Sequence, residues 1–250
     1  MRELTDDDLA AYLATGIGDI VRGTRAGGLL HGRTLAGVAN DVAQSWTDEV
    51  LSAHRPLDGT LSEGVSDDRS RLDRSRVWII DVIDGSKEFS TGRSDWSVHV
   101  ALVVDGHPTV AAVGLPDAGR VFSSTAVDHV DGPASGTMVI SRNNPPAGAA
   151  EVADALGLTL RPMGSAGAKM LSVLLGDADV YLHAGGQHEW DQAAPVGVAL
   201  AAGLHASRID GTPIPFNKPD TYSPDILVCR PDMTEEVLAA AAAHMPPSGQ

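Results

Sequence analysis

Asp81 and Asp84 stand three positions apart at the end of the apolar run 78–80 and are followed by Gly85 and Ser86. A run rich in isoleucine predicts a buried strand, so the carboxylates and the hydroxyl should lie where that strand turns. Clustered oxygen donors of this kind suit a hard divalent cation such as Mg²⁺. An ordinary strand followed by an Asp-Gly turn explains the same residues without a metal.

Two further acidic residues strengthen the metal interpretation. Glu63 follows a short predicted strand, and Asp191 opens a predicted helix of small residues. An aspartate at this place is also a common helix cap. Together with Asp81 and Asp84, these residues would supply carboxylate oxygens for two or three Mg²⁺ ions, an arrangement that serves phosphate chemistry by stabilising the attacking and leaving oxygens.

Two glycine-containing segments favour a phosphate ligand. Gly85 and Ser86 follow the aspartates, and Gly164 and Ser165 precede a predicted helix that carries Lys169. Backbone N–H groups at a helix start accept anions readily, although capping by Ser165 is the simpler explanation of the second segment. Neither segment matches the P-loop or dinucleotide fingerprint.

Other catalytic chemistries find little support. The chain has no Gly-x-Ser-x-Gly elbow and no His-Glu-x-x-His spacing, and its single cysteine is Cys229. His183 and His188 flank a glycine-containing segment near Asp191. They are either solvated loop residues or substrate contacts.

The elements that must position these residues change character along the chain. The first half reads as two helices and a largely antiparallel meander, with helices over 5–25 and 40–54 and strands ending near 63 and over 77–81, 96–104, 109–115, 121–124 and 137–141. The second half alternates, with helices over 149–156, 165–175, 192–202 and 234–245 and strands over 158–161, 179–183, 205–209 and 226–229. Thr5 and Thr234 are the expected N-caps of the first and last helices. Asp105 and Gly106 predict a hairpin turn between the strands over 96–104 and 109–115.

A joint at 143–146 divides the chain into two predicted halves. Residues 1–142 would form an α+β half with most of the metal ligands. Residues 143–250 would form an α/β half with the Trp-Asp motif and the substrate contacts.

Composition narrows the possible partners. The 250 residues carry a formal net charge of −15, which disfavours nucleic-acid polymers and anionic membranes. A small anionic substrate remains compatible, because bound cations reverse the local field. One cysteine and an N-terminus without signal-peptide features favour a reducing cytoplasm, and no apolar stretch is long enough to span a bilayer.

Three segments, taken in order, resemble the inositol monophosphatase superfamily: Leu-Ser-Glu-Gly at 61–64, Trp-Ile-Ile-Asp-Val-Ile-Asp-Gly-Ser at 78–86, and Trp-Asp-Gln-Ala-Ala at 190–194. The resemblance implies an α+β fold, namely a layered α/β/α/β/α sandwich with mixed and antiparallel sheets. It also implies Mg²⁺ dependence, inhibition by Li⁺ and a possible homodimer. The segments 84–89 and 164–169 are most similar to the 3′(2′),5′-bisphosphate nucleotidase branch, whose members convert 3′-phosphoadenosine 5′-phosphate to AMP.

The resemblance also implies roles for the metal ligands. Glu63 and Asp81 would bind one ion, with the main-chain carbonyl of Val82 or Ile83 nearby. Asp81, Asp84 and Asp191 would bind a second ion.

The remaining implied roles concern water and substrate. Ser86, with Glu63, would orient the attacking water, and Asp41 would assist a third ion. The N–H groups of Gly85 and Ser86 would hold the phosphate, and Lys169 would recognise a second phosphate.

Three departures from the family pattern keep other functions open. Gly64 replaces the second acid of a Glu-Glu pair, Val82 replaces a proline, and Ser86 replaces a threonine. The alternatives are another monoester substrate, such as an inositol monophosphate, a sugar phosphate or a nucleoside 5′-monophosphate of secondary metabolism, and a non-catalytic nucleotide-binding protein.

Overall fold

Two long helices open the chain in the computed structural model, which describes residues 4–127 and 132–246. Helix α1 (Asp6–Ala26) begins as predicted, because the Thr5 side chain accepts a hydrogen bond from the Asp8 N–H at 3.1 Å. Helix α2 (Gly32–His54) begins well before the predicted start at Asn40. Its apolar residues at 35, 39 and 43 recur every fourth position and are all buried, so packing extends this helix.

The first sheet has the strand order β1-β2-β3-β4-β5. Its members are β1 (Gly59–Ser62), β2 (Arg76–Asp84), β3 (Ser97–Val104), β4 (His107–Leu115) and β5 (Arg120–Ser123). Strands β2 to β5 form the predicted antiparallel meander, and β1 pairs parallel with β2. Asp105 and Gly106 turn the β3–β4 hairpin with φ values of 50° and 81°, which confirms the Asp-Gly turn.

Short helical segments connect these strands. They are the 3₁₀ turns η1 (Ser70–Asp73) and η2 (Pro116–Ala118) and the five-residue helix α3 (Ser86–Ser90). Helix α3 follows β2 directly and was not predicted, although it begins at the Ser86 singled out above.

The second sheet is mixed, with the order β7-β6-β8-β10-β9. Its members are β6 (Thr137–Ser141), β7 (Thr159–Met163), β8 (Val180–His188), β9 (His205–Ser207) and β10 (Tyr222–Cys229). Strand β6 is parallel to β7 and β8, whereas β10 is antiparallel to β8 and β9. The accompanying helices are α4 (Ala149–Leu156), α5 (Ala166–Leu174), α6 (Glu189–Ala201) and α7 (Thr234–His244), with the 3₁₀ turn η3 (Pro231–Met233) before α7.

Several local predictions in this half were wrong. Helix α6 begins at Glu189 instead of 192, and β10 begins at Tyr222 instead of 226. Strand β8 continues to His188 instead of ending at His183, because its last residues pair with β10. The pairing register between the two strands shifts at Gly185 and Gly186, as in a β-bulge. Thr234 is the first residue of α7 and not its N-cap, because the preceding turn leaves Met233 at that position.

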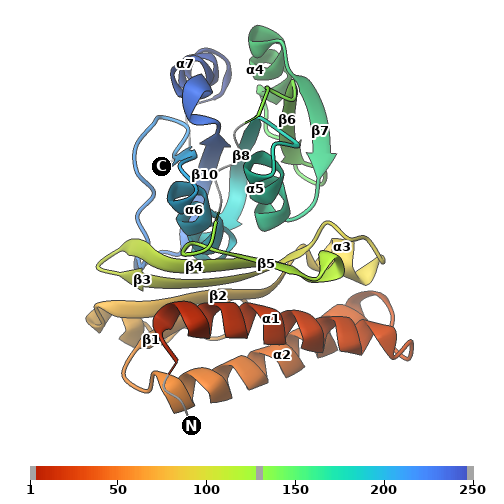
Figure 1. Ribbon diagram of the computed structural model, residues 1–250, viewed down its shortest axis with the longest axis vertical. Coiled ribbons are helices and arrows are strands. Elements are labelled where there is room, and N and C mark those ends of the chain that lie inside the picture. Colours follow the sequence, from red (N-terminus) through yellow and green to blue (C-terminus); the bar gives the residue numbers. More distant parts are fainter. Residues whose placement is uncertain (1–3, 128–131, 247–250) are drawn as a thin grey trace.

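Five layers result from two sheets and three helix layers (Figure 1). Helices α1 and α2 cover one face of the first sheet, α5 and α6 lie between the sheets, and α4 and α7 cover the outer face of the second sheet. Strand β2 shows the pattern, since Trp78 and Ile80 pack toward α1 and α2 while Val77 and Ile79 pack toward α5 and α6. The predicted layered α+β sandwich is confirmed.

The division of the chain into 1–142 and 143–250 stays a prediction, although β6 already belongs to the second sheet. One apolar core, which includes Ile79 of β2, Met170 of α5 and Ile226 of β10, spans the space between the sheets. Within the described ranges, none of the helices combines the length and apolar character needed to cross a bilayer.

Candidate active site

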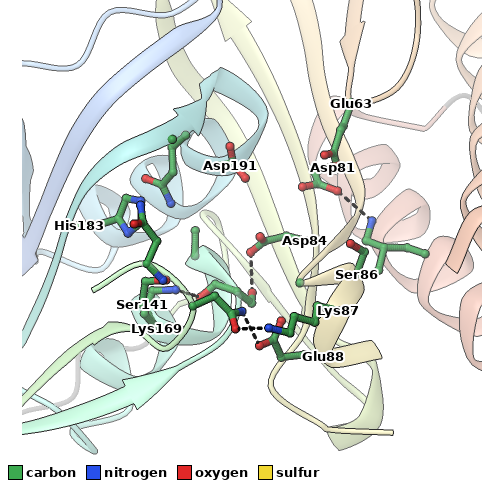
Figure 2. Close-up of a pocket in the computed structure, with 18 of the residues that line it drawn as sticks. Glu63, Asp81, Asp84, Ser86, Lys87, Glu88, Ser141, Lys169, His183 and Asp191 are labelled. Atoms are coloured by element: carbon green, nitrogen blue, oxygen red, sulfur yellow. Dashed lines mark hydrogen bonds between the residues drawn. The ribbon is translucent and has the colours of Figure 1, made fainter. Parts of the chain in front are cut away.

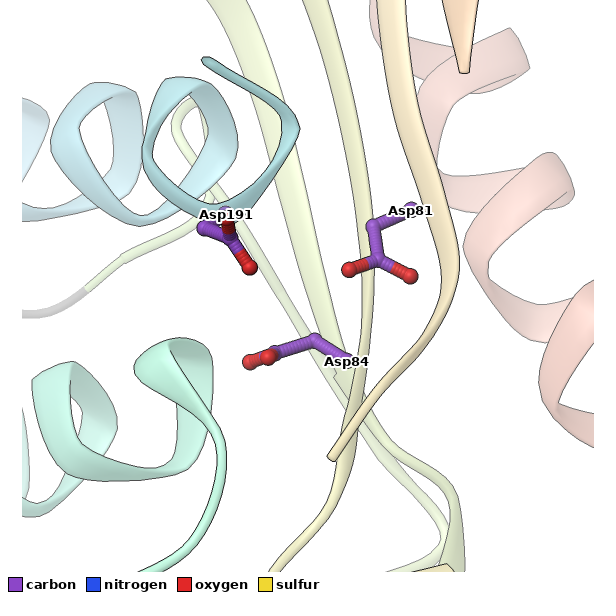
Figure 3. A group of neighbouring side chains, drawn as sticks. All are labelled: Asp81, Asp84 and Asp191. Carbon is purple, nitrogen blue, oxygen red and sulfur yellow. The ribbon is translucent and has the colours of Figure 1, made fainter. Parts of the chain in front are cut away.

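Three aspartates from distant regions of the chain converge between the sheets. Asp81 and Asp84 lie at the end of β2, and Asp191 lies in the first turn of α6. One carboxylate oxygen from each lies within 4.8 Å of the others. Figure 3 shows the three side chains grouped together. Asp81 is 1% exposed and Asp84 is 8% exposed. The fold therefore concentrates negative charge in a buried place.

Hydrogen bonds orient the two aspartates of β2. Asp81 accepts the Ile83 N–H through Oδ1 at 2.9 Å. Asp84 accepts the Ser165 hydroxyl at 2.5 Å and the Gly167 N–H at 3.2 Å, both through Oδ2. Asp81 also forms a side-chain hydrogen bond with Glu63. Among the described residues, no donor contacts Oδ1 of Asp84, so that oxygen is open to a ligand.

Asp191 follows the same pattern from the other side. Its Oδ2 accepts the His188 N–H at 2.6 Å, which forms part of a capping box at the start of α6. The cap interpretation and the metal interpretation of Asp191 are therefore compatible. Its Oδ1 receives no recorded bond from the described residues of the chain.

Without a cation, burial and mutual repulsion disfavour the ionised form of the carboxylates in the cluster. Burial, followed by the charges of neighbouring carboxylates, raises the pKa of Asp81 well above its ordinary value and that of Asp191 to about 7. Burial also acts to raise the pKa of Asp84, but the charge of His99 and hydrogen bonds from His99 and Ser165 outweigh it, so that this pKa is lowered. Three oxygen donors that repel one another fit a hard divalent cation.

The cluster lines a cavity of about 280 Å³, together with Glu63, Ile83, Gly85 and Ser86 (Figure 2). Glu63 stands at the exposed rim, where partial burial and the charge of Asp84 raise its pKa. Of the two proposed carbonyl donors, Ile83 lines the cavity and Val82 does not.

A turn at Gly85 brings Ser86 into the cavity. Gly85 has φ of 89°, and a Cβ there would lie 3.3 Å from the Cβ atoms of Ser165 and Trp96. Only glycine fits this turn without strain. Ser86, the next residue, is exposed and lines the cavity.

Besides Val82, two predicted site residues are not brought to the cavity. Asp41 is exposed on α2 and does not line it. The neighbouring Asn40 faces the loop after β1, because its Nδ2 lies 3.8 Å from where a Cβ on Gly64 would stand. Gly164 is also absent from the lining, and its N–H donates to Asp95 at 2.8 Å instead of to a ligand.

Ser165 and Lys169 line the cavity but are already engaged. The Ser165 hydroxyl accepts the Ala168 N–H at 3.1 Å and so caps α5, besides its bond to Asp84. The Lys169 ammonium donates to the carbonyls of Gly164 and Ser165 at 3.2 and 2.6 Å. Burial lowers the pKa of Lys169 to about 8.

The two histidines are ordered members of β8. His183 is 6% exposed, lines the cavity and donates from Nε2 to the Gly185 carbonyl at 2.7 Å. His188 stacks on Trp190 with ring centroids 4.7 Å apart. The interpretation of both as solvated loop residues was wrong, because these residues belong to the strand.

The sequence resemblance included Lys87 in the segment 84–89 but assigned it no contact in the site. Lys87 lines the wall opposite Asp191, and its ammonium donates to Asn143 at 2.7 Å. Sequence reasoning missed the buried pair Ser97 and His99 next to Asp84. Their one signal was polar residues at alternate positions on the inward face of a predicted strand.

Comparisons with known proteins agree with this geometry. A model described as the inositol monophosphatase family matches residues 14–246. A relative from Mycobacterium leprae (strain TN), named 3′-phosphoadenosine 5′-phosphate phosphatase, is 44% identical over 254 residues, which cover 94% of this chain and 93% of the relative.

Solved structures show the same fold. CysQ from Bacteroides thetaiotaomicron superposes with a TM-score of 0.74 at 20% identity, covering 89% of this chain and 96% of that one. Inositol monophosphatase from Anabaena gives a TM-score of 0.74 at 22% identity, covering 97% of both chains. With the family match across most of its length, this chain belongs to the inositol monophosphatase family and is a phosphoric monoester hydrolase.

Proposed function

We propose that the chain is a Mg²⁺-dependent phosphatase that hydrolyses 3′-phosphoadenosine 5′-phosphate to AMP and phosphate. The observation that carries the proposal is the cluster of Asp81, Asp84 and Asp191, in which one carboxylate oxygen of each residue lies within 4.8 Å of the others. A relative with the corresponding name, at 44% identity, supports the choice of substrate.

The proposed ligand sets follow from the positions of the carboxylates. Glu63 and Asp81, with the Ile83 carbonyl, would hold one Mg²⁺, and Asp81, Asp84 and Asp191 would hold a second. When bound, these ions would activate water and neutralise charge on the phosphate and the leaving oxygen. Asp41 gives no support for a third ion, because it lies outside the cavity.

The chain's own residues would prepare the reaction in the following way. Ser86 and Glu63, both at the open side of the cavity, would hold the attacking water and orient its protons. The N–H groups of Gly85 and Ser86 would hold the phosphate, since the turn at Gly85 exposes this stretch of backbone to the cavity. Positioning and charge stabilisation then supply most of the rate gain.

Two lysines support a substrate with a second phosphate. Lys169 and Lys87 both line the cavity outside the acidic cluster. Two of the three N–H donors of Lys169 are used by backbone carbonyls, which leaves one for a ligand. Lys87 is exposed and is held by Asn143.

Phosphate release from a matched panel tests the proposal. The panel is 3′-phosphoadenosine 5′-phosphate, inositol 1-phosphate, AMP and fructose 1,6-bisphosphate, each with Mg²⁺ and with EDTA. We expect the highest kcat/KM for the first compound and no release in EDTA. A preference for AMP or inositol 1-phosphate would reject the proposed substrate, and release that persists in EDTA would reject the metal requirement.

Inhibition by Li⁺, a cytoplasmic location and a homodimer remain predictions. Li⁺ titration of phosphate release tests the first, cell fractionation the second and sedimentation of the purified protein the third.

A further inference from the structure

A fully buried histidine, His99 of β3, lies beside the acidic cluster. Its Nε2 is 3.3 Å from Asp84 Oδ2. Its Nδ1 is 3.0 Å from the carbonyl oxygen of Trp190, the residue that precedes Asp191 in the first turn of α6. The imidazole therefore contacts both the strand end that supplies Asp84 and the helix start that supplies Asp191.

The partners of the ring determine its orientation. A carbonyl oxygen only accepts, so His99 Nδ1 carries a proton and donates it to Trp190. Nε2 then faces the Ser97 hydroxyl at 2.8 Å, and this hydroxyl lies 3.3 Å from Asp84 Oδ2 and 2.6 Å from the Ser165 hydroxyl. One ring thus connects β2, β3, α5 and α6.

Packing by α5 leaves the ring no freedom to move away. A Cβ on Gly167 would lie only 2.4 Å from His99 Nε2 and from Ser97 Oγ. Helix α5 therefore approaches the two side chains closely because this position is glycine. The same Gly167 donates its N–H to Asp84.

We infer that His99 is a positioning residue that sets the location of Asp84 relative to Asp191 and so determines how tightly the cluster binds a divalent cation. This inference rests on the metal site proposed above. His99 is absent from the cavity lining, so it acts through its neighbours. Partners that orient metal ligands are typically worth about 10-fold to 100-fold in metal affinity.

Calorimetric titration of the metal-free protein with Mg²⁺ tests the inference without using activity. His99→Phe keeps a ring and removes both polar contacts, and we expect its Kd for Mg²⁺ to rise at least about tenfold. His99→Asn retains a donor near the Trp190 carbonyl, and we expect a smaller rise in Kd. It also provides a second variant should the phenylalanine variant fail to fold.

Leu102→Ala is the matched control on the same strand. Leu102 is buried on the opposite face of β3, against α1 and α2. We expect this variant to lose thermal stability in EDTA but to keep the native Kd for Mg²⁺. A higher Kd for Mg²⁺ in the His99 variants but not in Leu102→Ala would show that His99 positions the metal ligands and does not merely stabilise the fold.

Three outcomes would count against the proposals. Native affinity in His99→Phe, or in a folded His99→Asn when the phenylalanine variant does not fold, would overturn the role of His99 alone. An equal loss of affinity in Leu102→Ala would also overturn it, since any damage to β3 would then suffice. A native protein that binds no Mg²⁺ would reject the proposed metal centre as well.

Discussion

The two strand-to-helix junctions of the site hold their carboxylates differently. At the first junction, β2 leads into α3, and Asp84 is surrounded by donors: the Ser165 hydroxyl, the Gly167 N–H and the His99 ring. At the second, β8 leads into α6, and the His188 N–H is the one hydrogen-bond donor to Asp191 among the residues that the structure describes.

The different surroundings shift the pKa values of Asp84 and Asp191 in opposite directions. The charge and hydrogen bond of His99, the charge of Lys169 and the hydrogen bond from Ser165 outweigh burial and lower the pKa of Asp84, so this carboxylate is ionised at neutral pH in the metal-free protein. Burial and the charge of Asp84 raise the pKa of Asp191 to about 7, so its charge near neutral pH depends on the surroundings. Asp84 at the first junction is therefore a constantly charged ligand, whereas the charge of Asp191 at the second junction depends on whether a cation is bound.

Asp84→Asn should produce the largest effect, because it removes the negative charge of a proposed metal ligand. We expect phosphate release to fall at least about a thousandfold, equivalent to about 4 kcal/mol of transition-state stabilisation. Circular dichroism and thermal unfolding in EDTA should show a folded protein. Near-native turnover in this variant would remove the basis for the metal assignment.

Asp191→Asn should show the dependence of the second junction on pH. The ordinary pKa of 3.8 applies in the unfolded state and about 7 in the folded metal-free state. Between these values the folded state binds more protons, so the free energy of unfolding should decrease by a few kcal/mol as pH rises from about 4 to about 7. Urea unfolding in EDTA measures this decrease.

The asparagine variant should lack the contribution of Asp191 to that decrease. Mg²⁺ should also stabilise the native protein more at pH 8 than at pH 5, because the cation requires the ionised carboxylates. An unchanged pH profile in Asp191→Asn would show that this carboxylate is not the responsive group.

Lys169→Ala tests whether α5 only supports the first junction or also contacts substrate. If the remaining N–H of Lys169 binds a second phosphate, KM for 3′-phosphoadenosine 5′-phosphate should rise about tenfold, which corresponds to about 1.4 kcal/mol. KM for AMP, measured in parallel, should change much less. Equal changes for both substrates would assign Lys169 to structural support of its carbonyl partners.

Ser165→Ala should weaken the first junction moderately. The variant loses the α5 cap to Ala168 and a hydroxyl donor to Asp84, and we expect a stability loss of about 1–2 kcal/mol. Urea unfolding in EDTA measures it. A Ser45→Ala control removes an exposed hydroxyl on α2, which bonds only within its own helix, and should be nearly neutral.

Asp41→Asn should have the smallest effect, because Asp41 lies outside both junctions. We expect kcat and KM within about twofold of native, which corresponds to about 0.4 kcal/mol. Phosphate release at several Mg²⁺ concentrations is the measurement. A marked rise in the Mg²⁺ requirement would restore the role that the sequence resemblance implied for Asp41.

Much of this organisation was readable from local patterns. The apolar run before Asp81 predicted the strand end, Thr5 predicted the start of α1, and Asp105 predicted the hairpin. These predictions succeeded because each depends on neighbours along the chain, through side-chain alternation, capping or turn geometry.

Predictions that depended on distant partners were less secure. The predicted end of β8 was wrong because it is decided by pairing with β10. Asp41 lies outside the cavity, and the neighbouring Asn40 faces the loop after β1. A one-residue difference on a helix changes direction by about 100°, and no local pattern reveals which neighbour a helix face meets.

The sequence by itself determined that two aspartates end a buried strand, that a third opens a helix, and that all three belong with a phosphatase motif set. Only the tertiary structure decided that these carboxylates meet within 4.8 Å, and that His99 contacts both Asp84 and the carbonyl of Trp190 beside Asp191. The physical reason is that local order follows from propensities along the chain. Charge repulsion, burial and shared hydrogen bonds arise only when segments about a hundred residues apart are packed together.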